Sequence, residues 1–146
     1  MHTVTETDIN KPLVSVVMAT YNGERFIAEQ LESILTQTYS NLEIIIVDDR
    51  STDQSYTILE SYAAKDTRIR LFRNEQNLGY VKNFEKGLSL AGGVYIAPSD
   101  QDDIWLPHKI TTLVNHINDN TIVYSCLLYT SPSPRDYAAS RMPSSA

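Results

Sequence analysis

Three aspartates directly follow an apolar run of strand length in the second half of the chain. Asp100, Asp102 and Asp103 come after the run 94–97. Carboxylates this close together repel one another unless a cation or a hydrogen-bonding partner joins them. Oxygen ligands suit hard divalent ions such as Mg²⁺ or Mn²⁺ better than zinc or copper. The pattern therefore predicts a divalent-cation site, and a solvated acidic turn is the alternative.

A second acidic pair, Asp48 and Asp49, follows the apolar run 44–47. Carboxylates in this place accept hydrogen bonds from a nucleotide base or ribose in other folds. The alternative is a turn acid followed by an acid at a helix N-terminus. The segment 20–22 follows the first apolar run, where it either caps a helix or borders a base. Glycine-rich phosphate loops do not occur in the sequence, so a diphosphate bound here would depend on a metal ion for charge neutralisation.

The elements that must position these residues alternate along the chain. Apolar and β-branched runs predict strands over 13–18, 42–47, 68–72 and 94–97 and the start of a fifth over 121–124. Apolar residues at helical spacing predict helices over about 24–38, 51–64, 81–91 and 107–117. A capping box of Ser51 and Gln54 is expected to open the second helix. The alternation predicts a mainly parallel sheet with helices on both faces, whose carboxyl edge gathers the three polar clusters.

Composition is typical of a globular protein with one domain. The chain has 146 residues, 42% of them hydrophobic, and a formal charge of −6, which argues against nucleic acid as a partner. No apolar run reaches the roughly 20 residues of a membrane span. The polar segment 1–11 lacks the apolar centre of a signal peptide and is expected to be flexible. Cys126 is the only cysteine, which rules out a disulfide within the chain and favours the cytoplasm.

The segment 126–146 differs from the rest of the chain, because it has neither helical nor strand periodicity. It can be back-translated, in one reading frame, into the two ends of a transposase-type sequencing adapter, separated by the length of a sample index. A disordered natural tail is the alternative. We therefore expect the natural domain to comprise residues 12–125 and residues 126–146 to be a non-native, disordered tail.

Ordered motifs across 12–125 resemble the N-terminal, nucleotide-sugar-binding half of family 2 glycosyltransferases, which have the Rossmann-like GT-A fold. The motifs lie at 14–23, 47–53, 77–79, 93–96 and 99–107. The version at 99–105 is similar to that of rhamnosyltransferase-like members, which build bacterial surface polysaccharides. The resemblance implies an α/β fold that is truncated here after the fifth strand.

The resemblance also assigns roles to the polar clusters at the first two strand ends. Asp49, with Asp48 beside it, would hydrogen-bond the nucleotide base. Thr20 and Tyr21 would lie in the strip that flanks that base. These four residues would therefore bind the nucleotide part of the substrate.

The later motifs would hold the diphosphate and its metal ion. Asp100 and Asp102 match the DxD pair of the family: Asp102 would coordinate Mg²⁺ or Mn²⁺, and Asp100 would lie near the ribose and the metal. Lys82 and Asn83 fall where the family has polar residues near the diphosphate, and a solvated helix face is the alternative. Trp105 is expected to pack beneath the acidic loop.

The implied activity is inverting, metal-dependent transfer of a hexosyl or rhamnosyl group from a nucleotide-diphosphate sugar to a hydroxyl of a saccharide or lipid-linked saccharide. The general base is expected beyond Ser125, so the chain as given is expected to bind the donor without turnover. The full-length protein is expected in the cytoplasm or at the inner face of the membrane. Two alternatives stay open: a sugar nucleotidyltransferase, which usually has a glycine-rich basic loop unlike 19–23, and a non-catalytic nucleotide-sugar-binding module.

Overall fold

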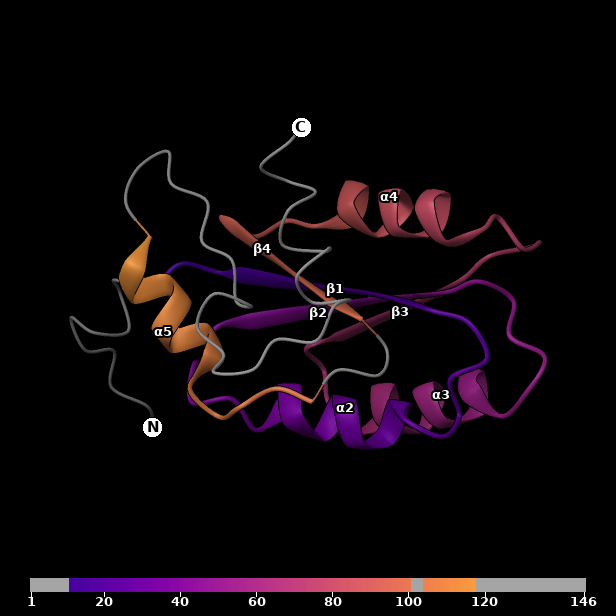
Figure 1. The fold of residues 1–146 in the computed structure, drawn as a ribbon, viewed down its shortest axis with the longest axis horizontal. Coiled ribbons are helices and arrows are strands. Elements are labelled where there is room, and N and C mark those ends of the chain that lie inside the picture. Colours follow the sequence, from indigo (N-terminus) through magenta and orange to yellow (C-terminus); the bar gives the residue numbers. More distant parts are fainter. Residues whose placement is uncertain (1–10, 101–103, 118–146) are drawn as a thin grey trace, which may run out of the picture.

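The structure, a computed structural model, describes residues 11–100 and 104–117. Its elements, labelled as in Figure 1, are β1 (Val14–Thr20), α2 (Ile27–Leu35), β2 (Leu42–Asp48), α3 (Ser55–Lys65), β3 (Ile69–Arg73), α4 (Tyr80–Leu90), β4 (Tyr95–Asp100) and α5 (Lys109–His116). Each of these elements was expected from the sequence. The predicted fifth strand over 121–124, the segment 1–10 and the predicted non-native segment 126–146 lie outside the described residues.

The strands form one parallel sheet in the order β3-β2-β1-β4. β1 and β2 occupy its centre, and every residue of the two strands except Glu43 is buried. Strands covered on both faces need apolar side chains at successive positions, which is why these two runs do not alternate with polar residues. The structure thus confirms the predicted parallel α/β sheet.

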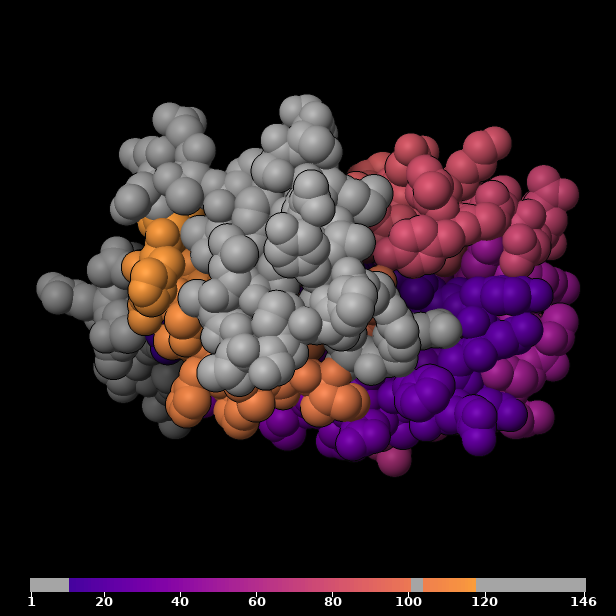
Figure 2. All heavy atoms as spheres, in the orientation of Figure 1, coloured from indigo at the N-terminus to yellow at the C-terminus, as the bar shows by residue number. Residues whose placement is uncertain are grey.

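Helices cover both faces of the sheet, as Figure 1 shows: α2 and α3 lie below it and α4 lies above it. The main core lies between the sheet and the first two helices and includes Val16, Met18, Ile44, Ile46, Ile27, Leu31, Ile34 and Leu59. Figure 2 shows the outer surface in the same orientation, with α4 in rose beside the indigo and violet atoms of the N-terminal elements. Among the described residues, no helix has the length and apolar character needed to cross a membrane.

The strand order reverses direction at β1. The chain passes from β1 to β2 and β3 on one side, and α4 then returns it to β4 on the other side of β1. Sheets of this kind bind ligands beyond the carboxyl ends of the strands at the point of reversal. The ends of β1 and β4 therefore mark the place where a ligand is expected.

Two helices begin later than the sequence indicates. α2 begins at Ile27, because the backbone N–H groups of Phe26 and Ile27 both donate to the Gly23 carbonyl in a preceding turn. The capping box predicted for α3 is wrong. Ser51 donates its hydroxyl to Asp48, and Asp53 accepts the Ser55 N–H at 2.9 Å.

The chain leading into α5 is fixed to the end of α2 by the amide of Gln37. The Gln37 Nε2 donates to the Leu106 carbonyl at 2.7 Å, and its Oε1 accepts the Ile110 N–H at 3.0 Å. Trp105, just before this segment, is buried in the core cluster, as expected of a packing residue. These bonds place the segment after the acidic loop against α2.

Gly87 allows α4 to lie close to the sheet. A methyl group added at this position would come within 2.6 Å of Val17 Cγ1 and 3.6 Å of Val47 Cγ2. Both valines are fully buried in the central strands, and a β-branched side chain has few alternative rotamers. The space between α4 and β1 therefore admits no side chain at this position.

We expect Gly87→Ala to destabilise the protein. Alanine favours a helix over glycine by about 1 kcal/mol, but overpacking a filled core costs about 1–3 kcal/mol. Because the contact with Val17 would be as short as 2.6 Å, we expect the upper part of that range and a net loss of about 1–2 kcal/mol. Urea unfolding of the two proteins measures it. Ser89→Ala, on the exposed face of the same helix, is the control and should change the free energy of unfolding by less than about 0.5 kcal/mol. An alanine variant as stable as the wild type would contradict the close packing.

At the amino edge of the sheet, the Glu43 carboxylate joins three elements. Its Oε2 accepts the Ser15 hydroxyl at 2.5 Å and the Gly92 N–H at 2.6 Å, and its Oε1 accepts Arg70 Nη1 at 3.2 Å. Arg70 also donates to the Leu90 carbonyl at the end of α4. Burial alone would raise the pKa of Glu43, but these hydrogen bonds and the guanidinium charge outweigh it and lower the pKa below its ordinary value.

This lowered pKa predicts how Glu43→Gln should behave with pH. Because the carboxylate is favoured in the folded state, its stabilisation is present above 4.5, the ordinary value, and is lost as the pH falls through the lower folded pKa. The difference in free energy of unfolding between wild type and Glu43→Gln should therefore narrow at acidic pH, as chemical denaturation at a series of pH values would measure. Ser15→Ala should move the loss to higher pH, because it removes one donor. A difference that widens toward acid would contradict this account.

Candidate functional site

The sheet register brings the polar clusters together at one edge. In β1, Thr20 pairs with Asp48 of β2, and Ala19 pairs with Asp100 of β4. Two strand spacings place the Cα atoms of the two aspartates about 10 Å apart. The loops after β1, β2 and β3 all leave the sheet at the right-hand side of Figure 1. The predicted meeting of the clusters at the carboxyl edge is therefore seen for the described residues.

Reciprocal hydrogen bonds hold the loops after β1 and β2 together. Asn22 donates its N–H to the Ser51 hydroxyl at 2.9 Å and accepts the Thr52 N–H on its Oδ1 at 2.8 Å. One residue further along, Gly23 donates its N–H to the Ser55 hydroxyl at 2.8 Å. Asn22 has φ +50°, a left-handed conformation that asparagine tolerates well. The two loops therefore form one connected wall of the edge.

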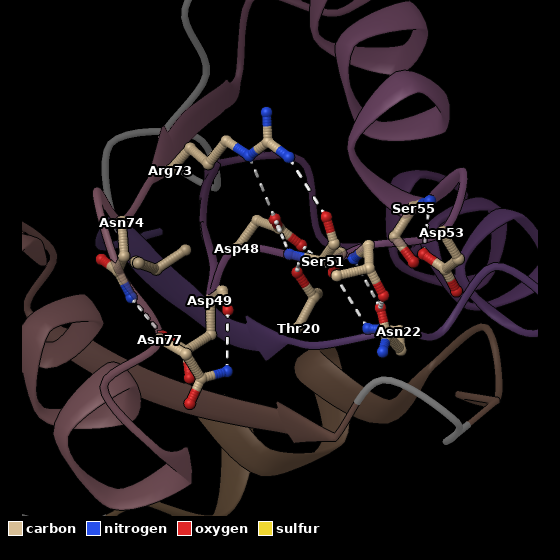
Figure 3. Close-up of polar contacts among 12 residues, drawn as sticks. Thr20, Asn22, Asp48, Asp49, Ser51, Asp53, Ser55, Arg73, Asn74 and Asn77 are labelled. Carbon is tan, nitrogen blue, oxygen red and sulfur yellow. Dashed lines mark hydrogen bonds and ion pairs between the residues drawn. The ribbon is translucent and has the colours of Figure 1, made fainter.

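Asp48 is fully buried and is held on the side of the sheet that faces α3. Its carboxylate accepts the Thr20 hydroxyl at 3.0 Å and both the N–H and the hydroxyl of Ser51. Arg73 Nε lies 3.7 Å away and supplies a positive charge, while the Arg73 guanidinium stacks on the Tyr56 ring. Figure 3 shows this cluster with Arg73 above Asp48. Asp48 and Thr20 are both predicted to face the nucleotide. In the structure both side chains are buried, and they form a hydrogen bond with each other.

Asp49 points away from Asp48 and holds the segment that precedes α4, as Figure 3 shows. Its side-chain Oδ1 accepts Asn74 Nδ2 at 2.8 Å and the Leu78 N–H at 2.7 Å, and its Oδ2 accepts the Gly79 N–H at 2.9 Å. The residue is only 2% exposed. Its predicted bond to a nucleotide base stays a prediction, and the carboxylate is engaged here with the protein itself.

Lys82 and Asn83 lie on different faces of α4, one exposed and one buried. Asn83 is buried, donates its Nδ2 to the Val47 carbonyl at 2.9 Å and accepts Asn74 Nδ2 at 2.7 Å. Lys82 is exposed in the first turn of the helix. Only the lysine therefore faces solvent, while the asparagine fastens α4 to β2.

Asp100 is half-buried at the end of β4, and its Oδ1 accepts the hydroxyl of Tyr80 at 3.0 Å. Tyr80 is the first residue of α4. Tyr21 lies exposed just beyond the end of β1. Asp102 and Asp103 lie outside the described residues, so their positions relative to Asp100 stay predictions.

The described part of the edge meets the needs of a hard divalent cation only in part. Among residues 11–100 and 104–117, no group of three or more His, Cys, Asp and Glu side chains is arranged to hold a metal. Asp48 and Asp49 are buried and already satisfied by hydrogen bonds, whereas Asp100 offers a half-exposed carboxylate. Mg²⁺ is commonly bound through one or two carboxylates together with substrate phosphates. Asp100 therefore provides one accessible carboxylate of the kind through which Mg²⁺ is commonly bound.

Sequence reasoning missed the residues that complete this edge. The bond from Tyr80 to Asp100 joins a helix start to a strand end, and no periodicity marks it. Asn74 was not singled out, although it donates to both Asp49 and Asn83. A polar side chain directly after the strand run 69–73 was the available signal, because the other strands are also followed by polar groups at this edge.

We expect Asp49→Asn to loosen the segment 74–79. The amide has one acceptor oxygen and would place an N–H group against at least one donor now bound by the carboxylate, at a cost of about 1–3 kcal/mol. Hydrogen exchange should show the amides of Leu78 and Gly79 losing protection. Glu85→Gln, exposed on α4, is the matched charge-removal control and should leave them protected. Unchanged exchange at both amides in Asp49→Asn would contradict the anchoring role.

Comparison with known proteins identifies the family. The family model described as glycosyl transferase family 2 matches residues 15–144, a range that extends into the segment 126–146. An uncharacterized glycosyltransferase of Haemophilus influenzae is 42% identical over 111 residues, which are 76% of this chain and 34% of that protein. The UDP-Glc:alpha-D-GlcNAc-diphosphoundecaprenol beta-1,3-glucosyltransferase WfaP of Escherichia coli is 38% identical over 113 residues, 77% of this chain and 44% of that protein.

Two solved structures have the same fold. The mannosyltransferase PcManGT of Pyrobaculum calidifontis, in complex with GDP-Man and Mn²⁺, matches with a TM-score of 0.71 at 25% identity over 89% of this chain and 38% of its own. TarS 1-349 of S. aureus, in complex with UDP-GlcNAc, matches with a TM-score of 0.65 at 27% identity over 82% of this chain and 39% of its own. The chain thus spans less than half the length of each of these proteins, and it belongs to glycosyltransferase family 2.

Proposed function

We propose that the protein transfers a sugar from a nucleoside-diphosphate sugar to an acceptor hydroxyl, with inversion and with a divalent metal ion, in the synthesis of a bacterial surface polysaccharide. One observation carries the proposal. Asp100 presents a half-exposed carboxylate where the strand order reverses, beside loops fixed by Asp48 and Asp49. The family membership and the GlcNAc-diphosphoundecaprenol acceptor named for WfaP support it.

Asp100 and Asp102 are the residues that would hold Mg²⁺ or Mn²⁺. The bound ion would supply charge stabilisation for the departing nucleoside diphosphate. Lys82, exposed in the first turn of α4, would add a second positive charge near the start of that helix. The Mn²⁺ in the PcManGT complex supports this choice of metal.

The nucleotide would lie along the ends of β1 and β2, against Thr20, Tyr21 and Asp49. Because Asp49 is buried, a direct bond to a base requires the surrounding residues to move far enough to expose its carboxylate. Asp48 would act indirectly, without touching the nucleotide, by holding the loop after β2 in place. Both aspartates then serve the donor site, but only Asp49 would contact the substrate.

The acceptor would be a saccharide or a lipid-linked saccharide, reached from the cytoplasm at the inner face of the membrane. Its hydroxyl must lose a proton to a general base as it attacks the anomeric carbon, and we place that base beyond Ser125. We expect the 146-residue chain to bind the donor but not to transfer sugar. Sugar transfer by the purified chain would contradict this expectation. Failure of the full-length protein to transfer would favour the alternative of a non-catalytic nucleotide-sugar-binding module.

Calorimetry of the 146-residue chain with UDP, GDP and dTDP, each with and without Mn²⁺, tests the donor site. We expect one nucleotide to bind more tightly with the metal. Asp102→Ala should weaken that metal-dependent binding by at least about tenfold, since even the outer-shell partners of a metal contribute this much. Glu60→Ala, exposed on α3, is the control and should bind as the wild type does. Binding that ignores Mn²⁺, or that survives Asp102→Ala unchanged, would count against the proposal.

A further inference from the structure

The phenol of Tyr80 connects the start of α4 with the end of β4. Its hydroxyl donates to Oδ1 of Asp100 at 3.0 Å, although the side chain as a whole is 62% exposed. Hydrophobic packing of the Tyr80 ring does not by itself account for a hydrogen bond from its hydroxyl. The contact therefore calls for an explanation in terms of Asp100.

The direction of the Tyr80 side chain is fixed from two sides. Gly79, at φ +89°, turns the chain into the helix, and its N–H group is held by Asp49. The Tyr80 ring then stacks on Phe84 one helical turn later, with centroids 6.1 Å apart and planes inclined by 15°. The position from which the Tyr80 hydroxyl reaches Asp100 thus depends on Asp49, which holds the preceding residue Gly79.

A carboxylate at a strand end can rotate about its terminal bond, and a hydrogen bond to one oxygen restricts that rotation. With Oδ1 held by Tyr80, the second oxygen of Asp100 has a preferred direction and a narrower range of orientations. The hydroxyl also brings no positive charge, so it orients the carboxylate without competing with a cation for its charge. Arg73 affects Asp48 differently, because it pairs with the charge itself.

We infer that Tyr80 is a positioning residue for donor binding: its hydroxyl orients the Asp100 carboxylate toward the metal-bound diphosphate. The inference rests on the proposed function, and it adds a residue outside the acidic motif. It also connects Asp49 with Asp100: Asp49 holds Gly79, and the next residue, Tyr80, holds Asp100.

Tyr80→Phe tests the inference, because it removes the hydroxyl and keeps the ring that stacks on Phe84. In calorimetry of the 146-residue chain with UDP, GDP and dTDP, we expect nucleotide affinity in Mn²⁺ to fall on the order of 3- to 10-fold, the effect of one hydrogen bond. Affinity without metal should be unchanged, and so should the midpoint of urea unfolding. A merely structural role would change both affinities together.

Tyr62→Phe is the matched control. Tyr62 also donates to a carboxylate, Glu32 Oε1 at 2.9 Å, but it lies between α2 and α3 away from the carboxyl edge. Its loss should leave nucleotide and metal binding unchanged.

The outcomes separate this inference from the proposed function. If the wild type binds a nucleotide with Mn²⁺ and Tyr80→Phe binds within twofold of it, the positioning role is overturned and the proposed function stands. The role is also overturned if Tyr80→Phe weakens binding equally with and without metal. If the wild type binds none of the nucleotides in Mn²⁺, the proposed function fails and this inference fails with it.

Discussion

Two adjacent carboxylates, Asp48 and Asp49, are buried at the end of a central strand, and the shape of the carboxyl edge follows from how they are compensated. A buried carboxylate without partners is strongly unfavourable, so donors must surround each one. Asp48 obtains them from Thr20, Ser51 and Arg73. Asp49 obtains them from Asn74 and the backbone of the segment 78–79. Because these donors come from the ends of β1 and β3 and from the loops after β2 and β3, satisfying the two charges fixes both of those loops to the strand ends.

The parallel sheet and the gathering of polar clusters at its edge could be predicted from the sequence, because both follow from local periodicity and from the rule that parallel strands end together. The different fates of Asp48 and Asp49 could not. Adjacent residues near a strand end point to opposite sides, and whether each meets a ligand or a protein donor depends on segments 25–30 residues away. Two of the donors to Asp49 are backbone N–H groups, which leave no mark in the sequence. The capping box failed for a related reason: the Ser51 hydroxyl accepts the Asn22 N–H and donates to the buried Asp48 carboxylate, so it is used outside the helix that it was expected to cap.

The two sides of β1 are not equally constrained. On the β2 side, the loops at 20–24 and 49–55 bind one another through several side-chain and backbone groups, with Asn22 and Arg50 in left-handed conformations. On the β4 side, the described residues give the Asp100 carboxylate one hydrogen bond, from Tyr80. A wall built on many mutual bonds holds its shape without a ligand, while a carboxylate held by a single phenol can still adjust its second oxygen. Such an edge suits a ligand in which one part has a constant shape and another part carries a negative charge that a bound cation would neutralise.

Charge balance leads to the same division of roles. The negative charge of Asp48 is paired with Arg73, and that of Asp49 is buried among donors. Of the three described aspartates at the ends of β2 and β4, namely Asp48, Asp49 and Asp100, only Asp100 combines partial solvent exposure with an uncharged partner. In the proposed function, a diphosphate would bring more negative charge to a chain that already has a formal charge of −6, so a cation would have to join the two. Among Asp48, Asp49 and Asp100, we propose Asp100 as the residue that would contact this cation, because the other two are buried and hydrogen-bonded within the protein.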